Sequence, residues 1–159
     1  MLKKFLLALF SLTVILMSTA AAQGKCPTYL DAAKNYILFA DLGAQGAGLY
    51  IDKHTCGAAE ESAKECVILI DEVQVPDAAE GKTRIVNRYV HRYKFDLQKK
   101  TAYRYVNEED KWVKLDPTIT NPEDDNFTYD VRIAEMAYYL TYGKKFFDTF
   151  DKDFYKSLK

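Results

Sequence analysis

Residues 84–106 read RIVNRYVHRYKFDLQKKTAYRYV and decide the fold class. From Ile85 to Leu97, mainly apolar positions alternate with mainly charged ones, which is typical of a strand with one buried and one solvated face. Asn87 and His91 interrupt the apolar face, so we expect that face to be only partly covered. Residues 98–101 form a turn and residues 102–106 return, which predicts an antiparallel hairpin.

The length of this turn sets which side chains share a face. A four-residue turn puts Tyr103 and Tyr105 on the same face as Arg92 and Lys94, next to the charged positions of the first strand. A three-residue turn would reverse every one of those side chains.

The pattern outside the hairpin completes an α+β fold. Further strand-like runs lie at 36–40, 49–51, 67–75 and 111–115. The period then changes, because apolar residues recur at helical spacing from Ile133 to Leu140, with Asp130 available as an N-cap and Gly143 as a C-terminal stop. A Phe stripe over 147–158 predicts a second helix, which packs within one chain or across two copies as a homodimer. We expect an antiparallel sheet of about five to six strands with a C-terminal helix or two packed on it.

The first 22 residues predict an exported protein. Lys3 and Lys4 precede an uncharged apolar run and an Ala20-x-Ala22 site, which are the parts of a removable signal peptide. The apolar run of about 13 residues is shorter than the ~20 that a membrane-spanning helix needs. Cys26 follows Lys25 and does not sit at the cleavage point, so a lipid anchor is not expected. We expect cleavage after Ala22 and a single domain over 23–159 in the periplasm or outside the cell.

Composition excludes several classes of function. Residues 23–159 hold 20 Lys+Arg, since Lys3 and Lys4 lie before them, against 23 Asp+Glu, a net charge of −3. Such a chain is not a general nucleic-acid binder. With His54 and His91 as the only histidines and no catalytic signature such as G-x-S-x-G or H-E-x-x-H, no enzyme activity, metal or cofactor is expected.

The three cysteines predict one disulfide. Cys56 and Cys66 bracket a short segment between two strand-like runs, and an exported compartment permits the bond, so their pairing is the first expectation. Cys26 is then left over, although its pairing with either of the others stays open.

Basic and aromatic residues of the hairpin are the candidate binding site. They are Arg88, Arg92, Lys94, Tyr103, Arg104 and Tyr105. Such side chains together hold an acidic protein, a glycan or a phosphate by stacking and charge-assisted hydrogen bonds. The alternative is a solvated sheet face whose charges are neutralised by carboxylates of neighbouring strands.

The order of motifs resembles a known family. Gly48-Leu49-Tyr50-Ile51-Asp52 precedes the Val-rich run 67–75, the long strand 89–97, Tyr103-Arg104-Tyr105 and Trp112. Over roughly residues 38–117 this is similar to the small exported bacterial domains called surface-adhesin protein E. The resemblance implies an antiparallel sheet with a packed helix, no enzyme activity, and binding of host or envelope proteins.

Three classes of function follow. The first is a non-enzymatic, adhesin-like domain that engages a protein or glycan at the envelope or outside the cell. The second is a small-molecule carrier or inhibitor with a cleft between sheet and helix. The third is a hydrolase, which would require two buried carboxylates close together or a His–Cys contact.

Overall fold

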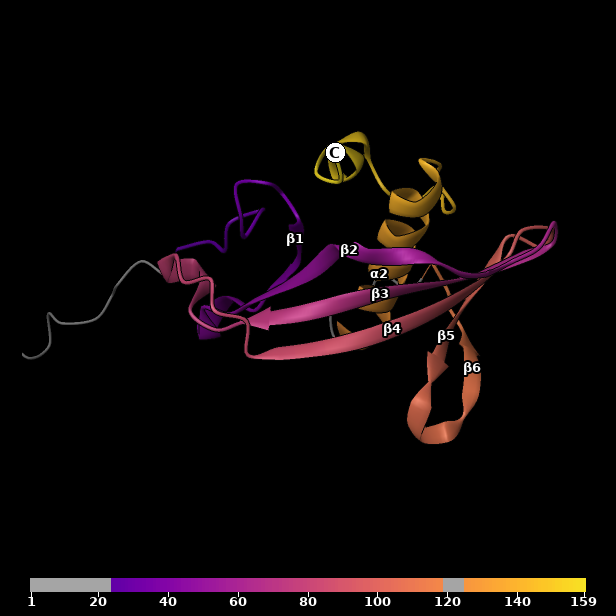
Figure 1. The fold of residues 1–159 in the computed structure, drawn as a ribbon, viewed down its shortest axis with the longest axis horizontal. Helices are drawn as coiled ribbons and strands as arrows, with labels where there is room; N and C mark the ends of the chain where they lie inside the picture. The colour runs from indigo at the N-terminus through magenta and orange to yellow at the C-terminus, as the bar shows by residue number, and fades with distance from the viewer. Residues whose placement is uncertain (1–23, 119–124) are drawn as a thin grey trace, which may run out of the picture.

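A six-stranded antiparallel sheet, in which each strand pairs with the next along the chain, carries one long helix on one face (Figure 1). The computed structural model describes residues 24–118 and 125–159, so the predicted signal peptide lies outside the described residues. The elements are β1 Tyr36–Asp41, β2 Gly48–Glu61, β3 Glu65–Val75, β4 Asn87–Asp96, β5 Thr101–Val106, β6 Lys111–Lys114, α2 Asp125–Tyr142 and α3 Lys152–Lys156. The predicted α+β class with a packed helix is confirmed. None of the helices in these ranges has the length and apolar character to cross a membrane.

The hairpin of β4 and β5 has the predicted four-residue spacing. Asp96 pairs with Thr101 and Lys94 with Tyr103, so the turn is residues 97–100, one residue earlier than the predicted 98–101. Directly paired residues in antiparallel strands point to the same face. Tyr103 therefore shares a face with Lys94, as expected for this turn length.

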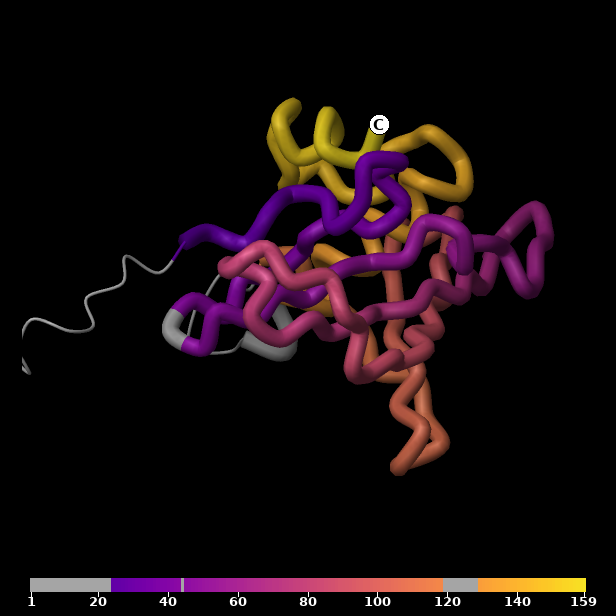
Figure 2. The backbone as a smooth tube through the Cα atoms, turned by 60° about the vertical axis from the view of Figure 1, so that its left-hand side comes forward, coloured from indigo at the N-terminus to yellow at the C-terminus, as the bar shows by residue number. Residues whose placement is uncertain are grey.

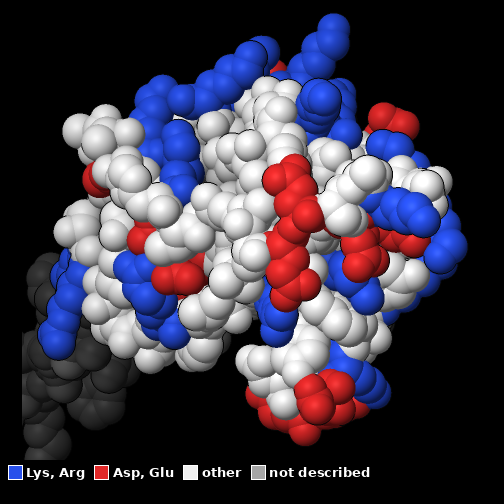
Figure 3. Space-filling model, turned by 45° about the vertical axis from the view of Figure 1, so that its right-hand side comes forward, with Lys and Arg blue, Asp and Glu red and all other residues white. Residues whose placement is uncertain are grey.

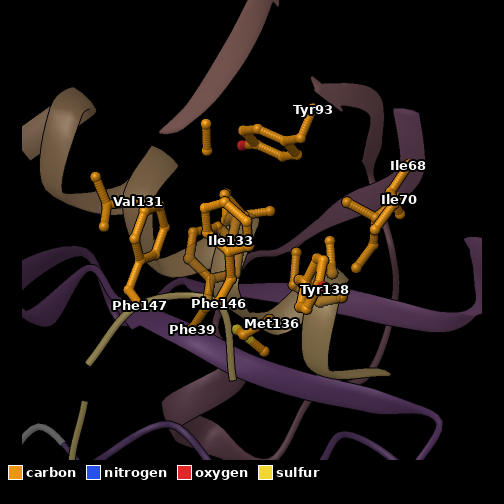
Figure 4. Packing of buried hydrophobic residues seen from close by; sticks show 14 of the residues in the cluster. Phe39, Ile68, Ile70, Tyr93, Val131, Ile133, Met136, Tyr138, Phe146 and Phe147 are labelled. Carbon is orange, nitrogen blue, oxygen red and sulfur yellow. The ribbon is translucent and has the colours of Figure 1, made fainter. Parts of the chain in front are cut away.

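The core lies between the sheet and α2. Ile68, Ile70 and Tyr93 of the sheet are fully buried, and they meet Ile133 and Met136 of the helix (Figure 4). Burying a side chain of this size stabilises the fold by roughly 1.5–3 kcal/mol. The alternation seen in the sequence thus separates a face that packs against α2, called the inner face here, from the opposite outer face.

The helices differ from the prediction at their beginnings. α2 begins at Asp125, so Asp130 is an internal, buried residue of the helix and not its N-cap. Its carboxylate accepts a hydrogen bond from the Tyr93 hydroxyl at 3.0 Å. The end is as predicted, because Gly143 has a φ of 66° and its amide donates to the Tyr139 carbonyl at 2.8 Å.

The predicted second helix over 147–158 is mostly irregular chain. Only α3 is helical in this tail. The tail is held instead by Glu135, which is fully buried in α2 and accepts hydrogen bonds from the amides of Phe146 and Phe147 and from the Tyr155 hydroxyl. The position of the C-terminal tail is therefore fixed mainly by hydrogen bonds to one buried carboxylate and not by regular secondary structure.

The outer face has a smaller core of its own at one end of the sheet. Tyr50, Val73 and Val75 are buried there beneath Cys26 and Ala78. The segment around Cys26 continues along β1, where the Leu38 amide donates to the Thr28 carbonyl at 2.9 Å and Tyr29 bridges to Ile37. This arm covers the free edge of β1.

The predicted Cys56–Cys66 disulfide is wrong, because all three cysteines are free. β2 continues to Glu61, which pairs with Cys66. Cys56 lies five residues before Glu61, roughly 15 Å along an extended strand. A disulfide needs Cα atoms within about 7 Å. Instead, the Cys56 sulfur faces α2, 3.4 Å from the Ala137 carbonyl oxygen.

Thiol labelling checks this assignment. Burial raises the pKa of Cys26 to about 11 and also raises the pKa of Cys56 and of Cys66. Because the thiolate is the reactive form, we expect slow labelling of the folded protein at pH 8 and three labelled thiols per chain after unfolding without reductant. A count of one thiol in the unfolded chain would restore the disulfide.

Candidate binding groove beside strand β4

The six residues predicted to form a binding face lie on both sides of the sheet. Arg104 pairs with Tyr93 in the β4–β5 register and therefore lies on the inner face. The others belong to the outer face or its margin: Arg88, Arg92, Lys94, Tyr103 and Tyr105.

On the outer face the cations of β4 stack on rings of β5 and β6. The Arg92 guanidinium lies 5.3 Å from the Tyr105 ring centre and 5.7 Å from that of Trp112, and it pairs with Glu60 at 3.1 Å. The Lys94 ammonium lies 4.8 Å from the Trp112 ring centre. These cation–π contacts hold β6 on the sheet. The basic and aromatic groups of this face therefore already interact with each other.

Arg88 forms ion pairs with two carboxylates. Asp52 and Asp71 are directly opposite each other on β2 and β3, an arrangement that is destabilising for like charges. The Arg88 guanidinium bridges them, 2.9 Å from Asp52 and 2.7 Å from Asp71. Hydrogen bonds to Asp71 and then to Asp52 raise the pKa of Arg88.

Arg104 is occupied on the inner face. It pairs with Asp130 of α2 at 2.7 Å, and the same carboxylate accepts the Tyr93 hydroxyl. Burial raises the pKa of Asp130, an effect that the Arg104 charge and the Tyr93 hydrogen bond oppose. The pair therefore holds α2 on the sheet, with the Asp130 carboxylate buried and the Arg104 side chain 35% exposed.

The charged groups of this region are thus largely neutralised by neighbouring strands and by α2. In Figure 3, basic and acidic side chains are interspersed over the visible face, and the projecting hairpin at the bottom ends in acidic residues. This arrangement is closer to a solvated sheet face whose charges are neutralised by neighbouring carboxylates than to a free basic surface.

A groove opens where β4 and β5 separate. Their pairing stops at Tyr93 and Arg104, and the β5–β6 hairpin then projects away from the sheet (Figures 1 and 2). The resulting groove has a volume of about 600 Å³. It is lined by Glu72, Arg88, Tyr89, Val90, His91, Arg104, Tyr105, Val106, Asn107 and Glu108.

Unpaired backbone groups of β4 face this groove. The Leu97 amide donates to the Lys64 carbonyl at 2.8 Å, which fixes the odd-numbered residues of β4 as those that bond to β3. The even-numbered residues point the other way. Between Asn87 and Tyr93 no described strand pairs with β4 on that side, so the amide and carbonyl groups of Arg88 and Val90 are directed into the groove.

Apolar side chains flank the same edge. Val86, Tyr89 and Val90 are 46%, 51% and 59% exposed, and they are the large hydrophobic side chains that stand out as exposed among the described residues. Natural sheets usually protect an edge with charges or a covering segment. Here Arg88 is turned back onto Asp52 and Asp71, which leaves the edge without its charge.

The other two sheet edges are protected. The arm around Thr28 covers β1, and β6 is only four residues long and begins and ends in lysine. Within the described part of the chain, two stretches of strand lack a partner on one side: residues 87–92 of β4 and the part of β2 beyond Lys53. The β4 stretch is the one flanked by exposed large apolar side chains and a groove.

Polar residues at the floor of the groove were not identified from the sequence. His91 Nε2 lies 2.8 Å from a Glu72 carboxylate oxygen, and the His91 ring stacks on Tyr93. The interruption of the apolar face at His91 was the available signal. Glu72 could not be paired with it without knowing the register of β3 on β4.

Searches of known protein families, of curated proteins and of solved structures find no match to this chain.

Proposed function

We propose that this protein is a non-enzymatic binding domain that acts outside the cytoplasm and holds an extended segment of a partner polypeptide along the open edge of β4. The observation that carries the proposal is the unpaired edge between Asn87 and Tyr93. An extended chain placed there would add a strand to the sheet and satisfy backbone groups that now face the groove.

The side chains of the edge favour an apolar segment with β-propensity. Tyr89 and Val90 lie on opposite faces of β4, so a paired strand would contact one of them on each side. Because Arg88 and Arg104 already pair with carboxylates, an acidic segment would gain little from either of them. Valine, isoleucine and aromatic residues at alternate positions of the partner suit this surface.

The compartment and the resemblance support the same reading. The signal-like sequence over 1–22 predicts export, and the likeness to surface-adhesin protein E implies a protein-binding domain without enzyme activity. A partner at the envelope or outside the cell is therefore part of the proposal.

A proline at position 90 tests strand addition. The Val90 amide points away from β3, so proline removes a hydrogen bond to an added strand while sparing the β3–β4 ladder. Peptides selected from a random displayed library against the wild-type protein should bind Val90→Pro at least about tenfold more weakly, equivalent to about 1.4 kcal/mol. The affinities can be measured by fluorescence anisotropy.

Val90→Thr is the matched control, because it keeps the amide and the β-branched shape and should keep most of the affinity. Selected peptides that bind Val90→Pro as tightly as wild type would refute strand addition. A concentration-dependent dimer that Val90→Pro dissociates would instead assign the edge to a second copy of the chain.

A further inference from the structure

A second cleft lies between the N-terminal arm around Thr28 and the C-terminal tail. Its volume is about 520 Å³. The N-terminal arm and β1 form one wall, and α2 and the C-terminal tail form the other; Figure 2 shows the arm beside the tail. It is lined by Thr28, Leu38, Arg132, Thr149, Phe150, Asp151, Asp153, Phe154 and Ser157.

The Arg132 guanidinium places a positive charge in this cleft, and no carboxylate of the described residues forms an ion pair with it. Among the described residues it forms no ion pair, and its Nε is buried without a hydrogen-bond partner. Its guanidinium lies 5.3 Å from the Phe154 ring centre. Burial lowers the pKa of Arg132, and the nearby Tyr129 and Asp151 oppose this effect without forming an ion pair with it among the described residues. A buried guanidinium donor without an acceptor is costly, and it invites an acceptor from outside the chain.

The two aspartates of the cleft are committed elsewhere. Asp151 caps α3 by accepting the Phe154 amide at 2.9 Å, and Asp153 pairs with Lys156 at 2.6 Å. They leave Arg132 without a direct carboxylate contact, yet their negative charges remain nearby. An incoming anion therefore meets one unpaired cation and some repulsion, which disfavours a doubly charged phosphate more than a singly charged carboxylate.

The other residues that line the cleft indicate what kind of molecular body the ligand carries. Phe150 and Phe154 stack with ring centres 4.3 Å apart, and Leu38 joins them in the lining. The hydroxyls of Thr28 and Thr149 add polar groups. Three apolar side chains and six polar or charged ones line the cleft, so it suits a ligand that combines an apolar body with a polar head.

We propose that this cleft binds a carboxylate with an aromatic or alkyl body, and that the Arg132 guanidinium holds the carboxylate while Leu38, Phe150 and Phe154 contact the body. The planar guanidinium matches a carboxylate with two parallel hydrogen bonds. The site is separate from the β4 groove and shares no lining residue with it. A small organic acid and the C-terminus of a peptide both carry this chemistry.

Calorimetric titration of the full chain with 3-phenylpropionate and octanoate, each beside its neutral amide, tests the proposal. We expect the acids to bind at least tenfold more tightly than the amides. Arg132→Gln should lose that preference and remain folded, since it removes a partly buried cation that forms no ion pair among the described residues. Arg84→Gln, at an exposed arginine outside the cleft, is the matched control and should bind like wild type.

Arg132→Lys is a second variant. It keeps the positive charge but lacks the planar guanidinium that donates two parallel hydrogen bonds, so it should weaken acid binding severalfold. A short peptide ending in Phe, with a free or an amidated C-terminus, distinguishes the two sources of the carboxylate. If the peptide with the free C-terminus binds more tightly than the small acids, the natural ligand is a peptide C-terminus. Equal binding of acid and amide by the wild type, or acid binding that Arg132→Gln leaves unchanged, would overturn the proposal.

Discussion

Glu135→Ala is expected to lower the free energy of unfolding by roughly 3–5 kcal/mol, a large loss for one substitution. The Glu135 carboxylate is fully buried and accepts the amides of Phe146 and Phe147 and the Tyr155 hydroxyl. Alanine leaves these donors without an acceptor and detaches the C-terminal tail from α2. Urea unfolding followed by circular dichroism measures the loss, and hydrogen exchange at Phe146 and Phe147 reports the detachment.

Two further variants separate the carboxylate from its position. Glu135→Gln keeps one acceptor oxygen but turns an NH₂ group toward a donor, so an intermediate loss is expected. Glu65→Ala, at an exposed glutamate, should change stability by less than about 0.5 kcal/mol. Near-wild-type stability of Glu135→Ala would refute the anchoring role.

The Glu135 interaction also has a predictable pH dependence. Burial raises the pKa of Glu135, so the folded state holds this proton more tightly than the unfolded chain, whose glutamate titrates near about 4.3. Its contribution to stability is therefore largest at low pH and falls as pH rises through the raised folded-state pKa. The stability advantage of wild type over Glu135→Gln should narrow as the pH rises above about 4.3.

Arg104→Ala is expected to cost roughly 1–3 kcal/mol of stability, because it leaves the Asp130 carboxylate buried without its cation, although Arg104 itself is 35% exposed. The residue was predicted from sequence as a binding group, so this measurement also decides between the two roles. Lys94→Ala, which removes a cation on the outer face that stacks on Tyr103 and Trp112, should cost less than about 1 kcal/mol.

Acidification should reduce the cost of Arg104→Ala. Burial already raises the pKa of Asp130, and losing the Arg104 charge raises it further, so the variant regains stability relative to wild type as pH falls toward about 4. Replacing Arg104 and Asp130 together with leucine, and Tyr93 with phenylalanine, should recover much of the loss. A loss at Arg104 that is independent of pH would argue against the ion pair as its cause.

The amino-acid sequence by itself determined that the strands, the hairpin and the long helix exist, although β2 extends far beyond the predicted 49–51 and α2 begins before Asp130. Alternation from Ile85 to Leu97 and helical spacing from Ile133 to Leu140 are properties of neighbouring residues, and hydrophobic burial acts on them locally. The four-residue turn likewise fixed which face Tyr103 shares with Lys94. The tail was the exception, because its Phe stripe has helical spacing although its anchor is Glu135, more than ten residues earlier.

Only the tertiary structure decided how the charges, cysteines and edges are used. Asp130 looked like a helix cap from its neighbours, yet it pairs with Arg104 on a strand more than twenty residues away. The Cys56–Cys66 distance depends on how far β2 extends before its turn. The open edge of β4 and the unpaired Arg132 arise from where β5 and the C-terminal tail lie in space. Local periodicity does not encode these contacts, since they depend on the register and packing of elements distant in the chain.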